Sequence, residues 1–172
     1  EMVRLQGKEL LICYSKIDHP AVTSLADKYF GSHVKFYELN RDKNLHYEHQ
    51  KNFEFIKDKK DNNPDLIILI HHLWVHNETG QVSPLSNLTQ FKSISDLYIH
   101  IDAVQAPGKI SDWQQLSEGD IWTFSAHKFG ALKGIGFSFF KSEIPFHGLI
   151  LGGGQQNHLR SGTENPQGIK SI

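Results

Sequence analysis

The feature that most constrains the fold is the alternation of short apolar runs with segments of helical periodicity. The clearest run, residues 66–70, is continuous and rich in β-branched side chains, which is typical of a strand buried on both faces. Similar runs lie at residues 10–13, 34–39, 97–101 and 121–124. Strands separated by helical segments predict βαβ units, and therefore an α/β fold around a mostly parallel sheet.

The helical segments between these runs are less regular. Residues 21–26 place apolar side chains at helical spacing after Pro20, which suits the first turn of a helix. A second helix is predicted at residues 47–57 and is expected to end in the charged stretch before Pro64, and a weaker one is predicted at residues 85–91. The apolar run 135–140 follows a glycine-rich turn too short for a crossover helix, so this strand is expected to be antiparallel to its neighbour.

The composition is that of one soluble globular domain. Of the 172 residues, 38% are hydrophobic and 22% are charged, which is enough apolar material to form a core. The net charge of -1 and the lack of a long Lys/Arg run argue against a nucleic-acid partner. No apolar stretch approaches the length of a bilayer span and no signal-like segment opens the chain, so we expect a cytoplasmic location and no membrane partner.

The cysteine and histidine content offers no metal site. Cys13 is the only cysteine, which excludes an internal disulfide and a cysteine zinc site. Because it falls in an apolar run, it is expected to be a small core residue. His71, His72 and His76 have no clustered carboxylates beside them and match no metal-ligand spacing, so no metal is expected.

The strongest chemical signal is Lys128, which ends the segment Ser-Ala-His-Lys directly after the apolar run 121–124. Asp102 closes an earlier apolar run, and ligands of parallel α/β sheets bind outside the carboxyl ends of the strands. A lysine amine can close a Schiff base on the aldehyde of pyridoxal phosphate, and a carboxylate can keep the pyridine nitrogen protonated. A lone lysine is usually a surface residue and an Asp is often a turn former, but their position at strand ends favours a cofactor site.

Six blocks of sequence resemble the cysteine desulfurases of the class V aminotransferase group. They span residues 18–22, 77–80, 100–105, 125–128, 133–136 and 160–165, in the family's order and close to its spacing. The resemblance implies a three-layer, mostly parallel α/β structure, namely part of the large domain of a fold type I pyridoxal phosphate enzyme. Residues 1–172 are then expected to form a single, incomplete domain that lacks the family's amino-terminal part and small carboxyl-terminal domain.

The resemblance also implies a role for each candidate residue. Lys128 is expected to bind the cofactor covalently, and Asp102 to pair with the pyridine nitrogen. Gln105 and Asn77 are expected to donate hydrogen bonds to the phenolic oxygen, although ordinary loop hydrogen bonding is the alternative for both. His19 is expected to stack on the ring and to help proton transfer, and its alternative is a surface histidine at a helix start.

The remaining candidates are phosphate ligands. Ser125 and His127 resemble the family's phosphate ligands, because a hydroxyl and an imidazole can both hydrogen-bond to a doubly charged group. Thr163 resembles a phosphate ligand that the second subunit of a homodimer contributes. The family's Gly-Ala-Thr-like phosphate loop, its persulfide-forming cysteine and its substrate-carboxylate arginine have no counterpart in the sequence, and Arg160 is not assigned to the last role.

The function implied is conversion of L-cysteine to L-alanine with release of transferable sulfur to an acceptor protein, for iron-sulfur clusters or thio-cofactors. Without a mobile thiol, this segment is expected to be inactive alone. Two alternatives stay open. One is another class V enzyme, such as a selenocysteine lyase or an aminotransferase, and the other is a truncated, non-catalytic chain that serves as a dimerisation or interaction module.

Overall fold

The computed structural model describes residues 7–28, 31–111, 113–144, 148 and 150–172. Within this part of the chain, one six-stranded sheet has the order β2-β1-β3-β4-β5-β6. The strands are β1 (Leu10–Tyr14), β2 (Val34–Glu38), β3 (Ile67–Leu73), β4 (Leu97–Asp102), β5 (Ile121–Ser125) and β6 (Gly136–Phe140). Neighbouring strands are parallel except β6, which runs antiparallel to β5, so the predicted mostly parallel sheet and its antiparallel strand are confirmed.

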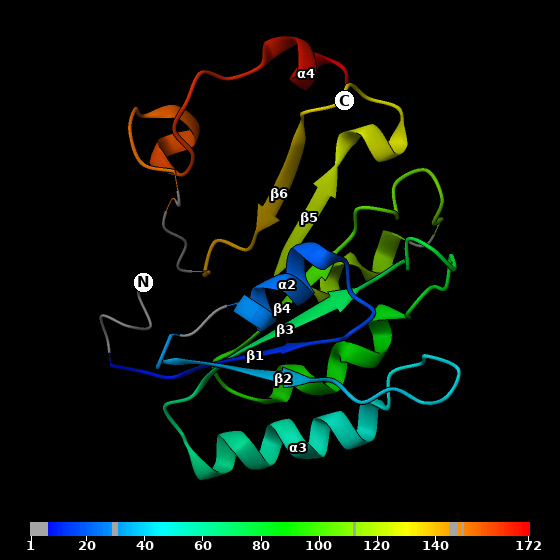
Figure 1. Ribbon diagram of the computed structural model, residues 1–172, viewed down its shortest axis with the longest axis vertical. Helices are drawn as coiled ribbons and strands as arrows, with labels where there is room; N and C mark the ends of the chain where they lie inside the picture. The colour runs from blue at the N-terminus through cyan, green and yellow to red at the C-terminus, as the bar shows by residue number, and fades with distance from the viewer. Residues whose placement is uncertain (1–6, 29–30, 112, 145–147, 149) are drawn as a thin grey trace.

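Helices cover both faces of this sheet, as Figure 1 shows. The connection from β1 to β2 holds α2 (Pro20–Lys28), and the connection back across β1 to β3 holds α3 (His49–Asn62). Because crossovers are right-handed, these two helices lie on opposite faces. The turns η1 (Leu85–Ser93) and η2 (Trp113–Glu118) lie in the connections from β3 to β4 and from β4 to β5. These connections cross the sheet in the same direction as the one that holds α3, so the two turns share its face.

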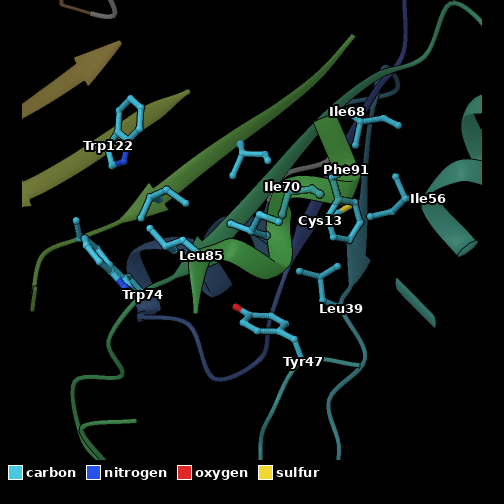
Figure 2. Close-up of a cluster of buried hydrophobic side chains, with 14 of the residues drawn as sticks. Cys13, Leu39, Tyr47, Ile56, Ile68, Ile70, Trp74, Leu85, Phe91 and Trp122 are labelled. Carbon is cyan, nitrogen blue, oxygen red and sulfur yellow. The ribbon is translucent and has the colours of Figure 1, made fainter. Parts of the chain in front are cut away.

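The core lies between the sheet and the layer formed by α3 and η1. Figure 2 shows side chains of β1, β3 and η1 pointing into it, among them Cys13, Ile70 and Leu85. Cys13 and Leu85 are 0% exposed and Ile70 is 1% exposed, which confirms the predicted core role of the cysteine. Each fully buried aliphatic side chain contributes roughly 1.5–3 kcal/mol, so this face supplies most of the hydrophobic stabilisation.

The opposite face is less completely covered, and one prediction is wrong for that reason. The run 66–70 was expected to be buried on both faces, but along β3 the side chains of Ile67 and Leu69 are only partly buried. They face the α2 side, and α2 has no fully buried residue of its own. A short helix covers this wide face in part, which leaves room for polar side chains near the carboxyl ends of the strands.

Two helix predictions need correction. The helix expected to end near residue 57 continues to Asn62 in α3, because its charged side chains form the solvated face and Lys57 pairs with Asp61 one turn later. Lys60, also in that charged stretch, is buried and donates to the carbonyl oxygens of Pro64 and Leu66. The weak helix at 85–91 is the 3-10 turn η1.

No helix in the described residues has the length and apolarity needed to cross a membrane.

Candidate active site

The carboxyl ends of the parallel strands gather the candidate residues at one edge of the sheet (Figure 1). The strand order reverses between β1 and β3, because β1 continues to β2 on one side and β3 continues to β4 on the other. In open α/β sheets, ligands bind at such a switch point, outside the strand ends. His19 follows β1, Asn77 follows β3, Asp102 ends β4, and Lys128 follows β5.

Lys128 lies in η3 (Ala126–Phe129), a single 3-10 turn directly after β5. The turn ends at Gly130, whose φ of 103° is left-handed and whose N–H donates to the Ala126 carbonyl. The Lys128 side chain is exposed and forms no ion pair with any described residue. Its side chain is therefore accessible to a ligand.

The two predicted phosphate ligands near Lys128 already contact each other. Ser125 ends β5, and its Oγ lies 3.0 Å from Nδ1 of His127. Both side chains therefore point to the same side of the turn that holds Lys128. A hydroxyl and an imidazole in contact can bind one anion together.

Asp102 is half-buried at the end of β4, and its Oδ1 accepts the Val104 N–H at 3.0 Å. Burial raises the pKa of this carboxyl, and the hydrogen bond from the Val104 N–H and the charge of nearby His19 lower it in part. The carboxyl is thus poorly compensated by the described residues. A cationic group placed against it would favour its ionised form.

Gln105 is held by a residue that sequence reasoning missed. Lys109 Nζ donates to Gln105 Oε1 at 2.8 Å and to the Lys128 carbonyl at 3.2 Å. Lys109 therefore ties the loop after β4 to the turn after β5. Its i, i+4 spacing from Gln105 was the available signal, but the second contact depends on the packing of two loops.

His19 and Asn77 lie on the two loops that flank the switch point, and both are exposed. His19 Nδ1 accepts the Ala21 N–H at 3.2 Å, so the imidazole caps the start of α2. In the other loop, His76 Nδ1 accepts the Thr79 N–H at 3.2 Å. His76 thus shapes the turn that presents Asn77.

Thr163 lies outside this group. It is exposed and follows η4 (Gln155–His158), which Figure 1 places away from the carboxyl ends of β1, β3 and β4. No side chain of the chain's own strand-end group contacts it. Its assignment to the phosphate of a second subunit stays a prediction.

A row of buried and partly buried polar side chains lies behind the exposed candidates. Asp18, His71, His100 and Thr123 follow one another across the α2 face of the sheet, with 2.8 Å between Nδ1 of His71 and Nδ1 of His100. Burial raises the pKa of Asp18 to about 7 and lowers the pKa of His100 to about 4. The sequence shows these residues, but only the pairing of β3 with β4 brings the histidines together.

The strand-end group is open to solvent. A hollow of about 390 Å³ lies at the ends of β1 and β2 and is lined by Ser15, Lys16, Ile17, Glu38, Leu39, Asn40, Arg41, Asp42 and Leu45. None of the described residues that line it is a predicted cofactor ligand.

The donor set nevertheless fits pyridoxal phosphate. An available amine, an under-compensated carboxylate, two amide side chains and a hydroxyl–imidazole pair lie on adjacent strand ends of one sheet edge. These groups match an aldehyde, a pyridine nitrogen, a phenolic oxygen and a phosphate in turn. Among the described residues, no three His, Cys, Asp or Glu side chains converge as they would around a metal ion.

Comparison with known proteins agrees with this geometry. Residues 2–169 match the family described as aminotransferase class-V. A cysteine desulfurase of Sinorhizobium fredii is 32% identical over 161 residues, which are 94% of this chain and 40% of that protein. Cysteine desulfurase NifS of Azotobacter vinelandii is 28% identical over 169 residues, which are 97% of this chain and 40% of that protein.

Solved structures give the same fold. A NifS-like protein superposes with a TM-score of 0.81 at 30% identity, covering 96% of this chain and 44% of that one. The structure described as SspA in complex with cysteine superposes with a TM-score of 0.74 at 30% identity, covering 98% of this chain and 47% of that one. The chain spans about 40% of the length of the curated relatives named above.

Proposed function

Because the chain belongs to the aminotransferase class-V family, we propose that it contributes the cofactor-binding core of a pyridoxal phosphate-dependent cysteine desulfurase. The observation that supports this most directly is the placement of Asn77, Asp102 and Lys128 at the carboxyl ends of three adjacent strands, β3, β4 and β5. The identity of the curated relatives and the donor set of the site point the same way.

When bound, pyridoxal phosphate supplies an electron sink that stabilises negative charge on the α-carbon of an amino-acid substrate. Lys128, an exposed residue, would hold the cofactor through its Nζ, and the same amine would be the candidate base for the α-proton. Asp102 keeps the proton on the pyridine nitrogen. Ionisation of Asp102 is favoured by that cation, which offsets the rise in its pKa caused by burial.

The other residues orient the cofactor. Gln105 and Asn77 donate amide hydrogens to the phenolic oxygen, and Gln105 must then share its side chain with Lys109. Ser125 and His127 bind the phosphate from the turn after β5. His19 covers one face of the ring, and Thr163 of a second subunit completes the phosphate site in a homodimer.

The substrate we propose is L-cysteine, with L-alanine as the product and sulfur passed to an acceptor protein for iron-sulfur cluster assembly. The solved structure of SspA with cysteine supports this substrate class. Cys13 is not the sulfur carrier, because it is 0% exposed in the core and burial raises the pKa of its thiol. A single buried thiol suits a reducing compartment, and we propose a cytoplasmic location.

The cofactor assignment is tested by adding pyridoxal phosphate to the purified chain and recording its visible absorption. We expect a new band that Lys128→Ala abolishes and that the control Lys133→Ala, an exposed lysine on the same connection, retains. A band of equal intensity in Lys128→Ala would contradict the assignment. If the unsubstituted chain formed no band, the non-catalytic interaction module would be favoured.

A further inference from the structure

The row behind the site is a line of neighbouring polar side chains, of which Asp18 and His71 are buried. Nε2 of His71 lies 3.8 Å from Oδ2 of Asp18. On the other side, Nδ1 of His71 lies 2.8 Å from Nδ1 of His100, and Nε2 of His100 lies 2.9 Å from Oγ1 of Thr123. The line therefore runs from the loop after β1, across β3 and β4, to β5.

Sheet register explains why these four side chains meet. His71 and His100 are direct partners in the parallel pair β3–β4, and Thr123 is the partner of Asp102, two residues beyond His100 on the same face. Asp18 enters from the turn before α2, where its Oδ2 accepts the Ser15 N–H at 2.7 Å. Residues with alternate spacing face one side of a sheet, so the row occupies the half-covered α2 face.

Two atoms of this row lack a partner. Oδ1 of Asp18 and Nε2 of His71 are buried and make no hydrogen bond to any described residue, although the two side chains face each other. The side chains are 0% and 5% exposed. Buried polar atoms without partners are unfavourable, so a small rotation that closes an Asp18–His71 hydrogen bond is favoured.

The contact between the two rings restricts their protons. Burial lowers the pKa of both His71 and His100, so each ring is neutral and has one N–H. Because two Nδ1 atoms meet, one must have the proton and the other must accept it. The tautomers of the two rings are therefore opposite and coupled.

The coupling extends to Asp18. If Asp18 is ionised, His71 donates to it through Nε2–H, accepts from Nδ1–H of His100, and leaves His100 Nε2 to accept the Thr123 hydroxyl. If Asp18 is protonated, its O–H donates to His71 Nε2, and both rings reverse. Each ring has one proton in both states, so the only proton gained or lost is that of the carboxyl.

We propose that Asp18, His71 and His100 form a hydrogen-bonded chain in which the protonation state of Asp18 sets the tautomer of both imidazoles, and that this chain positions the turn bearing His19. The consequence for His19 as a ring-stacking residue rests on the proposed function. The tautomer coupling does not, because it uses only contacts within the chain.

Several charged and titratable groups shift the pKa values of the side chains in this row. Burial raises the pKa of Asp18 most, and Asp102 raises it further, whereas the Ser15 N–H and the charge of Arg41 lower it. The ionised carboxyl in turn raises the pKa of Tyr47 and Tyr14. His71 is acted on by His72 as well as His100. With a pKa of about 7 for Asp18, the switch is expected near neutral pH.

The test is an imidazole nitrogen NMR titration of the 172-residue chain with no cofactor added. As the pH rises through about 7, we expect His71 to change from Nδ1–H to Nε2–H and His100 to change from Nε2–H to Nδ1–H, with one shared midpoint. The resonances of His19 should shift at the same midpoint. Rings that keep one tautomer throughout, or that switch at different midpoints, would overturn the proposal.

Asp18→Asn supplies the matched variant, and Asp58→Asn, on exposed α3 surface, is its control. We expect the coupled switch and the His19 shift to be lost in Asp18→Asn and kept in Asp58→Asn. A switch that persists in Asp18→Asn would overturn the proposal. If that variant does not fold, the opposite tautomer changes in the unsubstituted chain still decide it, and neither result depends on whether pyridoxal phosphate binds.

Discussion

At the scale of single residues, the site is defined by groups whose charges are incompletely compensated. Asp102 is half-buried, one oxygen accepts a backbone N–H, and burial raises its pKa. Lys128 is exposed and unpaired among the described residues. A carboxyl whose pKa is raised by burial without a cationic partner is typical of functional sites rather than of structural ion pairs.

Asp102→Asn is expected to weaken binding of pyridoxal phosphate with little change in fold. The amide keeps the shape and can still accept the Val104 N–H, but it removes the charge that would face the pyridine nitrogen in the proposed site. A hydrogen bond to a charged group contributes about 1.5–3 kcal/mol, so affinity should fall roughly 10- to 100-fold. Titration of the visible band measures this.

The control for that substitution is Asp27→Asn, an exposed position on α2. Equal affinities in the two variants would show that Asp102 does not contact the ring. A fall in affinity of the unsubstituted chain at low pH is expected as well, because protonation of Asp102 removes the same charge.

At the scale of elements, the β5–β6 hairpin sets the position of Lys128. Gly136 pairs with Ser125, and a Cβ at Gly136 would lie 2.7 Å from the Phe124 carbonyl oxygen. Only glycine allows this close approach of the two backbones. The strand that follows the site therefore fixes the end of β5, from which Ser125 and Lys128 project.

Gly136→Ala is expected to lower the free energy of unfolding by about 1–3 kcal/mol, because the methyl group forces the strands apart. Urea unfolding followed by tryptophan fluorescence measures the change. Ser138→Ala, on the exposed side of the same strand, is the control and should change stability little. A stable Gly136→Ala variant would mean that β5 and β6 adapt without strain.

Element order and strand direction could be predicted from the sequence, but details set by tertiary contacts could not. The short turn before residue 136 correctly predicted an antiparallel strand, because it has no room for a crossover helix. The end of α3 was missed because the charged stretch is solvated along one helix face. The His71–His100 contact was missed because the register between β3 and β4 cannot be inferred from the sequence of either strand alone.

At the scale of the whole molecule, the sheet has one face that is packed over its central strands and one half-covered, polar face. The packed face holds the aliphatic core, and the other holds the strand-end group and the buried histidine row. The Asp102 and Lys128 candidates could be predicted because strand ends are visible in sequence. Their openness to solvent could not, since cover depends on what packs against the second face.

The buried histidines make the fold sensitive to acid. Burial lowers the pKa of His72 to about 3 and that of His100 to about 4. Between these values and the unfolded-state pKa near 6.5, the unfolded chain therefore binds protons that the folded chain excludes. The stability that these neutral histidines contribute is present above the unfolded-state pKa near 6.5 and is lost as the pH falls. Asp18 acts in the opposite direction, because its raised pKa stabilises the fold at low pH and this gain is lost as the pH rises through about 7.

Comparison of urea unfolding at pH 7 and pH 5 tests this balance. Between pH 7 and pH 5, each histidine that stays neutral in the folded chain should lower the free energy of unfolding by about 2 kcal/mol. From pH 7 to pH 5, the free energy of unfolding of His72→Leu should therefore fall by about 2 kcal/mol less than that of the unsubstituted chain. The exposed His46→Gln should behave like the unsubstituted chain, and a His72→Leu variant with the full pH dependence would place the effect elsewhere.

The most direct measurement of cofactor attachment is borohydride reduction of the chain with pyridoxal phosphate, followed by peptide mass mapping. We predict that the cofactor's mass is found on Lys128 and that Lys128→Ala leaves no other lysine labelled to the same extent. Preferential labelling of another lysine, or equal labelling of all exposed lysines, would contradict a cofactor site at the carboxyl ends of β3, β4 and β5.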